Sequence, residues 1–295
     1  MNSIKIAIKN KTKLTQRIEK LYDVTYYKKQ SLFSKLTFKQ NQYPDIYFHQ
    51  GVVDDTALNM IENSAKTIVN SNGMKLKIIN KLSAINKDKI EVVYPYTSNT
   101  LAYSKDLKKE FRTKFELDKK TRMIFFHGKD LVLSGLKTFL EILESLHSTS
   151  FVVMIESSSK EIQKLKLQIN RAKLPYKVIF FEDYENIEEL FIVSDIFILP
   201  TQLKLFAPSV LKAMYYRNAV FVMASNYSAE LIDTFSIIQS EHDRSTPFKV
   251  DALLINNDEL KNIQKENQKT SLNFGFESRV EKVVEIIDNK LSLKS

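Results

Sequence analysis

The chain has 295 residues, 43% of them hydrophobic, which is enough material for two domains with buried cores. It contains no cysteine, so disulfides, thiolate zinc sites and cysteine nucleophiles are excluded and a cytoplasmic location is expected. No apolar run approaches the roughly 20 residues that a membrane-spanning helix needs, and the N-terminus lacks the long apolar core of a signal peptide.

The formal charge of +9 is concentrated in the first third of the chain. Residues 1–100 hold 16 basic against 8 acidic side chains, and ten of the basic ones precede residue 40. Such a segment can attract anionic lipid head groups, which predicts peripheral attachment to the inner membrane face. An ordinary solvated surface rich in lysine is the alternative. Nucleic-acid binding would rest on charge alone and is not favoured.

Strand and helix patterns alternate along the first hundred residues. Short apolar runs predict strands at residues 4–8, 24–27, 45–49, 65–69 and 90–93. Helical spacing predicts helices at residues 12–22, 55–62 and 74–82, and residues 28–42 read as a basic connector. Tyr94, Pro95 and Tyr96 precede a polar stretch and predict a hinge. This hinge divides the chain into an N-terminal domain of residues 1–100 and a second domain of residues 101–295.

The alternation continues in the second domain. Strands are predicted at residues 123–126, 151–155, 177–181, 196–199, 219–224 and 252–255. Helices are predicted at residues 105–115, 134–146, 159–173, 187–193 and 277–291, and near residues 208, 229 and 258. This order is typical of parallel sheets covered by helices, so the predicted fold class is α/β with two Rossmann-like domains.

Residues 194–225 contain the predicted ligand site. A short buried strand at residues 196–199 is followed by a loop, and Pro208 suits the first turn of the next helix because its missing N–H would be unpaired there. In an open parallel sheet, ligands bind outside the carboxyl ends of the strands, and a helix N-terminus favours anions. We therefore expect the site at residues 201–212.

Five segments occur in a characteristic order: FFHGKDLVLSGLKTFLEIL, FEDYENIEELFIVSDIFILPT, LFAPSVLKAM, ASNYSAELI and FGFESRVEKVVEII. This series resembles the donor-binding domain of family-4 retaining glycosyltransferases of the GT-B fold. In the first domain only PDIYFH and AKTIVNSNGMKLKIINKL fit the family, and this acceptor-side domain is shorter than usual, so a partner protein could complete it.

The resemblance implies a GT-B-like chain whose two Rossmann-like domains face a cleft, with a C-terminal helix that returns to the first domain. It also implies transfer of a sugar from a nucleotide-sugar donor to a glycan or lipid-linked acceptor, with no metal or other cofactor. The alternative is a catalytically degenerate homologue that acts as a binding or scaffold subunit.

The family's motif positions define the candidate site. The donor-binding candidates are Gly128, Lys129, Ser134, Gly135, Lys204, Ser209, Lys212 and Glu230, and the catalytic candidate is His49. Family members hold the donor diphosphate with an arginine and a lysine, whereas these positions carry Lys129 and Ser134 here. The family's paired glutamates fall on Lys204 and Lys212, and a lysine cannot accept hydrogen bonds from a ribose diol.

Each candidate also has a structural interpretation. The three lysines form either a phosphate cradle, with Glu230 as the only nearby carboxylate, or an ordinary charged surface. Glu230 either binds a sugar or caps a helix at Ala229. His49 either faces the donor sugar or is a structural histidine at a strand end. The four histidines of the chain show no metal-ligand spacing.

Overall fold

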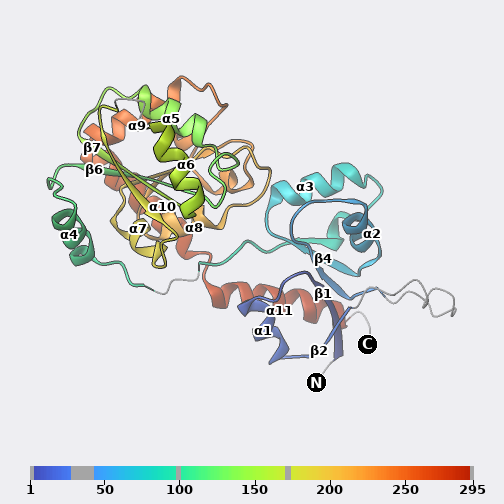
Figure 1. Cartoon of the computed structure of the whole chain (residues 1–295). Helices are drawn as coiled ribbons and strands as arrows, with labels where there is room; N and C mark the ends of the chain where they lie inside the picture. The colour runs from blue at the N-terminus through green and yellow to red at the C-terminus, as the bar shows by residue number, and fades with distance from the viewer. Residues whose placement is uncertain (1–2, 28–42, 98–100, 170–173, 293–295) are drawn as a thin grey trace. The chain divides into compact units, whose positions relative to one another are not determined.

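The computed structural model describes residues 3–27, 43–97, 101–169 and 174–292, and it divides into two compact units. Unit 1 comprises Met1–Tyr96 and Phe274–Ser295, and unit 2 comprises Thr97–Asn273 (Figure 1). The sheet in each unit consists of parallel strands, and helices cover both of its faces. The predicted α/β class is therefore confirmed. The expected connector at residues 28–42 lies outside the described residues.

Unit 1 is built on a five-stranded sheet with the order β2-β1-β3-β4-β5. Its strands are β1 (Ser3–Ile8), β2 (Asp23–Tyr26), β3 (Ile46–Phe48), β4 (Lys66–Val69) and β5 (Ile90–Val92). Its helices are α1 (Lys13–Glu19), α2 (Asp55–Asn63), α3 (Asn72–Lys81), the 3₁₀ helix η2 (Lys87–Lys89) and α11 (Phe276–Ser292).

Alternating apolar residues of the strands build the core of unit 1. Ile6 and Ile46 are buried on the face that α1 and α11 cover, and Val283 of α11 is fully buried with them. Helices α2 and α3 cover the other face, as Figure 1 shows. Asp54 begins α2 because its side chain accepts a hydrogen bond from the backbone N–H of Ala57 at 2.8 Å. The last helix of the chain is thus part of the core of unit 1.

Unit 2 is built on a six-stranded sheet with the order β11-β10-β9-β6-β7-β8. Its strands are β6 (Arg122–His127), β7 (Phe151–Ser157), β8 (Lys177–Glu182), β9 (Ile196–Leu199), β10 (Ala219–Met223) and β11 (Ile237–Ile238). Its α-helices are α4 (Lys105–Lys114), α5 (Leu136–Glu144), α6 (Ser159–Ile169), α7 (Ile187–Val193), α8 (Pro208–Tyr215), α9 (Ser245–Ile255) and α10 (Asn257–Leu272). Two 3₁₀ helices are η3 (Tyr227–Leu231) and η4 (Thr234–Ser236).

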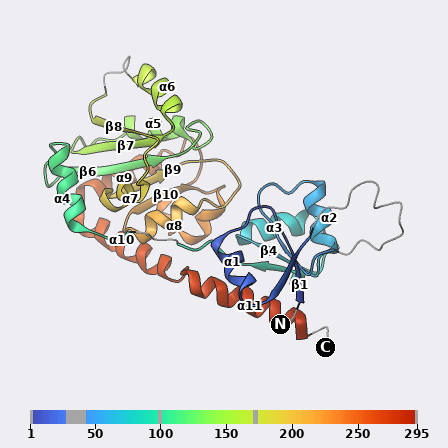
Figure 2. The same cartoon turned by 60° about the horizontal axis from the view of Figure 1, so that its bottom comes forward.

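The strands of unit 2 are apolar on both faces because helices cover both faces of the sheet. Helices α5, α6 and α9 bury one face, where Phe126 stacks on Phe139 of α5 at 4.6 Å between ring centroids. Helices α7, α8 and α10 lie on the other face, where Phe125 contacts Phe191 of α7 (Figure 2). This arrangement leaves the ends of the strands as the places where a polar ligand can approach.

One predicted strand is wrong: residues 252–255 form the end of α9. Val250, Leu253 and Leu254 recur at helical spacing and are buried against the sheet. A short apolar run fits either a strand or a buried helix face, so its periodicity alone did not decide between them. The helix expected near residue 229 is the 3₁₀ helix η3, and the short strand β11 was not predicted.

Candidate functional site

The strand order of unit 2 reverses between β6 and β9. The chain passes from β6 outward to β7 and β8, and then returns to β9 on the opposite side of β6 before continuing to β10 and β11. All these strands are parallel, so the loops after β6 and β9 leave the same edge of the sheet. Such a switch point is where open α/β sheets bind ligands.

The loop after β6 is held tightly against the end of β9. Gly135 has φ +92°, and a Cβ atom there would lie 2.3 Å from the carbonyl oxygen of Pro200, so no other residue fits without a shift. The hydroxyl of Thr201 donates to the carbonyl of Leu133 at 2.7 Å. The hydroxyl of Ser157, at the end of β7, donates to the carbonyl of Gly128 at 2.6 Å. Three neighbouring strand ends therefore fix the loop of residues 128–135.

The segment after β10 holds the loop after β9. The side-chain amide of Asn226 donates to the carbonyl of Leu203 at 3.0 Å. The hydroxyl of Ser228 accepts from the backbone N–H of Ala207 at 2.7 Å, directly before α8. The ASNYS stretch therefore positions the loop that carries Lys204 and the start of α8.

The N-terminus of α8 belongs to the same edge of the sheet. Pro208 is its first residue, as predicted, and Ala207 provides no side-chain cap. The half-buried Ser209 is the second residue of the helix. The N–H groups of a first turn and the helix dipole favour an anion at such a terminus.

Most of the sequence candidates in unit 2 lie on these segments. Gly128, Lys129, Ser134 and Gly135 lie on the loop after β6 or at its end, Lys204 lies on the loop after β9, Ser209 on α8 and Glu230 on η3. Lys129, Lys204 and Glu230 are exposed. Asn226 is the N-cap of η3, where its side chain accepts from the backbone N–H of Ser228.

Lys212 is placed differently from the other two lysines. Its ammonium group lies 2.8 Å from the Oε1 atom of Glu188 on α7, whose side chain is 9% exposed. The Oε2 atom of Glu188 accepts from the hydroxyl of Tyr216 at 2.7 Å and from the backbone N–H of Leu101 at 3.1 Å. Burial and the hydrogen bond to Glu188 raise the pKa of the Tyr216 hydroxyl, so it stays a donor. The positive charge of Lys212 is therefore matched by a buried carboxylate.

A second pair at the switch point was missed in the sequence. The Nδ1 atom of His127, the last residue of β6, lies 2.5 Å from the Oε2 atom of Glu156 on β7. Glu156 is buried, as is Glu188. The expectation that Glu230 is the only carboxylate near the motif segments is therefore wrong. One signal in the sequence could have indicated this pair: each residue stands at the end of an apolar strand pattern, and His127 directly precedes Gly128.

His49 lies in unit 1, directly after β3. Its imidazole is 5% exposed, and its Nδ1 atom is 3.2 Å from the hydroxyl of Tyr47. Its buried Nε2 atom makes no hydrogen bond within the described residues. Burial lowers the pKa of His49, and the backbone of Gly51 and the charge of Asp54 oppose only part of this effect. The imidazole is therefore neutral near pH 7.

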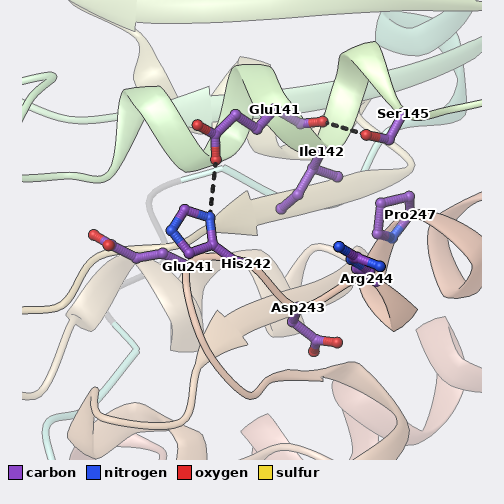
Figure 3. A pocket seen from close by; sticks show the side chains of 8 residues that line it. All are labelled: Glu141, Ile142, Ser145, Glu241, His242, Asp243, Arg244 and Pro247. Atoms are coloured by element: carbon purple, nitrogen blue, oxygen red, sulfur yellow. Dashed lines mark hydrogen bonds and ion pairs between the residues drawn. The ribbon is translucent and has the colours of Figure 1, made fainter.

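A separate cavity of about 310 Å³ opens between α5 and the loop before α9. The residues that line it are Glu141, Ile142, Ser145, Glu241, His242, Asp243, Arg244 and Pro247. Figure 3 shows His242 pointing toward Glu141, with 3.9 Å between Nδ1 and Oε2. None of the motif candidates lines this cavity.

Among the described residues, no group of three or more His, Cys, Asp or Glu side chains is arranged to hold a metal ion. No helix in the same ranges is long and apolar enough to cross a bilayer.

Comparisons with known proteins agree with this arrangement. The family described as glycosyl transferases group 1 matches residues 108–270, more than half of the chain. A search of curated proteins found no match. Anabaena Alr3699/HepE in complex with UDP is 12% identical and covers 98% of this chain and 100% of its own, with a TM-score of 0.75. The same protein with UDP-glucose is 13% identical over 83% of this chain and 72% of its own, with a TM-score of 0.69.

A glycosyltransferase from Rickettsia africae ESF-5 is 18% identical and covers 95% of this chain and 80% of its own, with a TM-score of 0.72. At these identities the solved structures show the fold, which is the predicted GT-B-like pair of Rossmann-like domains. The family match, by contrast, covers the strands, loops and helices that form the switch point. The chain therefore belongs to the glycosyl transferases group 1 family.

Proposed function

We propose that this member of the glycosyltransferase family transfers a sugar from a nucleotide-sugar donor to a glycan or lipid-linked acceptor, with retention of configuration and without a metal. The observation that supports this proposal is the meeting of the loop of residues 128–135, the loop of residues 201–207 and the N-terminus of α8 at the carboxyl ends of β6 and β9. The structural neighbour from Anabaena is in complex with UDP-glucose, a donor of this chemical class.

The chemistry of these segments suits a diphosphate leaving group. The first turn of α8 offers N–H groups to phosphate oxygens. Gly128 and Gly135 let the loop after β6 pack closely on the side chain of Ser134 and the backbone of Pro200, which holds this loop at the same edge of the sheet. Lys129 and Lys204 would add two positive charges, which stabilise the negative charge that develops as the sugar leaves. Lys212 is assigned a different role, because Glu188 already balances its charge.

His49 is proposed as a group that acts in sugar transfer and not in nucleotide binding. Its buried Nε2 atom has no hydrogen-bond partner in the described chain, which is costly unless a ligand or water satisfies it. A neutral imidazole can accept or donate one proton at this atom, so it suits contact with a sugar hydroxyl.

The test measures donor binding and turnover, including slow hydrolysis without acceptor, for UDP-glucose, GDP-mannose, ADP-glucose and dTDP-glucose. Lys129→Ala and Lys204→Ala should each weaken donor binding about tenfold if each lysine makes one charge-assisted contact. Lys261→Ala is the matched control: Lys261 is exposed on α10, whose neighbouring Gln264 contacts the carbonyl of Asp195 at the amino end of β9, the opposite edge of the sheet.

The transferase is supported if the natural chain turns over a donor, and if turnover falls in Lys129→Ala and Lys204→Ala but not in Lys261→Ala. Binding without turnover for any donor would favour the degenerate alternative. Absence of binding for all four donors would overturn the proposed site.

We also propose peripheral attachment to the inner membrane face. Lys9, Lys11, Lys13, Arg17 and Lys20 are exposed around the end of β1 and along α1. Within this group Lys11 is paired with Glu19 at 2.6 Å. Exposed lysines near anionic lipid each contribute about 1 kcal/mol, so even the remaining four form a useful electrostatic anchor.

A further inference from the structure

His127 and Glu156 form a pair of side chains with a defined orientation at the switch point of unit 2. They are opposite residues in the ladder between β6 and β7. A carboxylate accepts hydrogen bonds, so the 2.5 Å contact between Oε2 of Glu156 and Nδ1 of His127 requires a proton on Nδ1. The side chain of Glu156 is 9% exposed, so little water competes for it. The pair therefore fixes both the orientation of the imidazole and the tautomer of its neutral form.

The other ring nitrogen is available to a ligand. Within the described residues, the Nε2 atom of His127 makes no hydrogen bond, and the side chain remains 24% exposed. The rings of Phe125 and Phe191 flank the imidazole with centroids 6.3 Å away. The imidazole is thus paired with Glu156 and packed near two aromatic rings, and part of its side chain is exposed.

The imidazole of His127 belongs to the residue directly before the loop that carries Lys129. His127 precedes Gly128 directly, and Ser157, the neighbour of Glu156, fixes the carbonyl of Gly128. On the adjacent helix α7, Glu188 is already paired with Lys212 of α8. Ser134 is uncharged and occupies the motif position at which family-4 glycosyltransferases have a lysine. The segments that would bind a diphosphate therefore have fewer uncommitted cations than the sequence suggested.

We propose that His127, oriented by Glu156, is a binding residue for the donor diphosphate and donates a hydrogen bond from Nε2 to a phosphate oxygen. This inference rests on the proposed function. Because Nδ1 already carries a proton, donation from Nε2 requires the doubly protonated imidazolium. A phosphate bound at Nε2 favours that cation because it places a negative charge beside the ring. Donor binding at a pH where the unliganded imidazole is neutral should therefore take up one proton.

Within the described residues, the charged group that contacts His127 is Glu156 on β7. Lys129 follows on the next loop, and Glu188 and Lys212 are paired with each other on α7 and α8. The adjacent strand β9 carries no charged residue. Of these groups, His127 is the only imidazole. The proton uptake can thus be assigned by substituting this residue.

The test is isothermal titration of the full chain with UDP-glucose, GDP-mannose, ADP-glucose and dTDP-glucose between about pH 6 and pH 8, where an imidazole can change its charge. The diphosphate of each donor is substituted at both ends, so it has no proton to release in this range. In the natural chain, donor affinity should fall about tenfold over this range, and the heat should depend on the buffer as expected for uptake of one proton. His127→Gln should weaken binding at the lower pH about tenfold and abolish both the pH dependence and the proton uptake.

Two further variants make the result specific. Glu156→Gln keeps a hydrogen-bond acceptor but removes the charge, so it should reduce proton uptake while retaining part of the affinity. The control is His147→Gln, because His147 also forms a histidine–carboxylate pair in unit 2, with Asp251 at 3.2 Å, but is 76% exposed after the end of α5. It should behave as the natural chain does.

The outcomes separate the two proposals. Donor binding by His127→Gln with unchanged affinity and unchanged proton uptake would overturn the role of His127 and leave the proposed function standing. Failure of the natural chain to bind all four donors would overturn both. The pH dependence and proton uptake of the natural chain keep the test decisive even if His127→Gln folds poorly, because their absence contradicts the proposal by itself.

Discussion

The ammonium group of Lys212 lies 2.8 Å from the carboxylate of Glu188, and this pair links α8 to α7. The sequence suggested that Lys212 is part of a phosphate cradle or an ordinary surface residue. The structure shows a lysine that is 25% exposed and compensates a buried carboxylate. Glu188 in turn binds the backbone of Leu101, near the start of unit 2. Lys204 and Lys129 are therefore the positions at which to test donor binding.

Lys212→Met is expected to lower the free energy of unfolding by about 1–3 kcal/mol, because it leaves the charge of Glu188 buried with less compensation. Adding Glu188→Gln should recover part of this loss, since the amide keeps the contacts with Tyr216 and Leu101 while the charge is removed. Urea denaturation measures both effects. Lys261→Met on α10 is the control, and an equal loss there would contradict the assigned role of the pair.

Gly135→Ala is expected to damage the loop after β6. The substitution combines an unfavourable positive φ, which costs about 1–2 kcal/mol, with a clash against the carbonyl of Pro200. Gly51 separates the two effects because its φ is +97° but a Cβ atom there meets nothing within 4 Å. Gly51→Ala should thus cost only the backbone strain. We expect Gly135→Ala to lose more stability and also donor binding, as measured by thermal unfolding and titration. Equal stability losses would show that the contact with Pro200 relaxes easily.

His49→Gln is expected to reduce turnover about 100-fold, the usual scale for a positioned proton donor or acceptor, and to leave donor affinity unchanged. Steady-state kinetics and titration of the same preparation measure the two quantities. A loss of affinity equal to the loss of turnover would place His49 in nucleotide binding. Burial lowers the pKa of His49, so folding is weakened as the pH falls below about 6.5 and the buried ring must be protonated. His49→Gln should remove this part of the acid sensitivity.

Asp243 is expected to contribute to acid sensitivity at lower pH. Burial opposes ionisation, but the N–H groups of Gln239 and Ser245 and the hydroxyls of Ser245 and Thr246 outweigh it and lower the pKa of Asp243 to about 2. The folded-state pKa lies below the ordinary value, so the stabilisation is present above about pH 4 and is lost as the pH falls toward 2.

Asp243→Asn should therefore cost about 1 kcal/mol near neutral pH, allowing for solvent screening, and nothing near pH 2. Urea denaturation across this pH range measures the difference. A constant loss at all pH values would show that the carboxylate charge is not what stabilises the start of α9.

Vesicles test the proposed membrane attachment. The chain should co-sediment with vesicles that contain anionic phosphatidylserine and not with neutral phosphatidylcholine vesicles. Added salt should release it because exposed charges are screened over about 8 Å at physiological ionic strength. Replacing Lys9, Lys13 and Lys20 by glutamine should weaken the binding. Equal binding to both kinds of vesicle would exclude an electrostatic anchor.

The local pattern of the sequence was sufficient for much of the fold. The run at residues 196–199, Pro208 and the helical spacing after it predicted β9 and α8 closely, because apolar periodicity and proline geometry act over a few residues. It failed at residues 252–255, where a short apolar run had no feature to separate a strand from a buried helix face. The alternation of strands and helices also predicted the α/β class correctly.

The candidate site was only partly accessible from sequence. Motif order located the loop of Lys129, the loop of Lys204 and the start of α8, since each is a local segment. The partners of these segments are distant in the chain: Glu188 is 24 residues from Lys212, and Glu156 is 29 residues from His127. The register of parallel strands and the packing of α7 against α8 bring them together. Whether a buried charge is available to a ligand depends on whether such a partner already compensates it. The sequence determined the elements and the residues available for chemistry, whereas the tertiary structure decided which charges are already paired within unit 2.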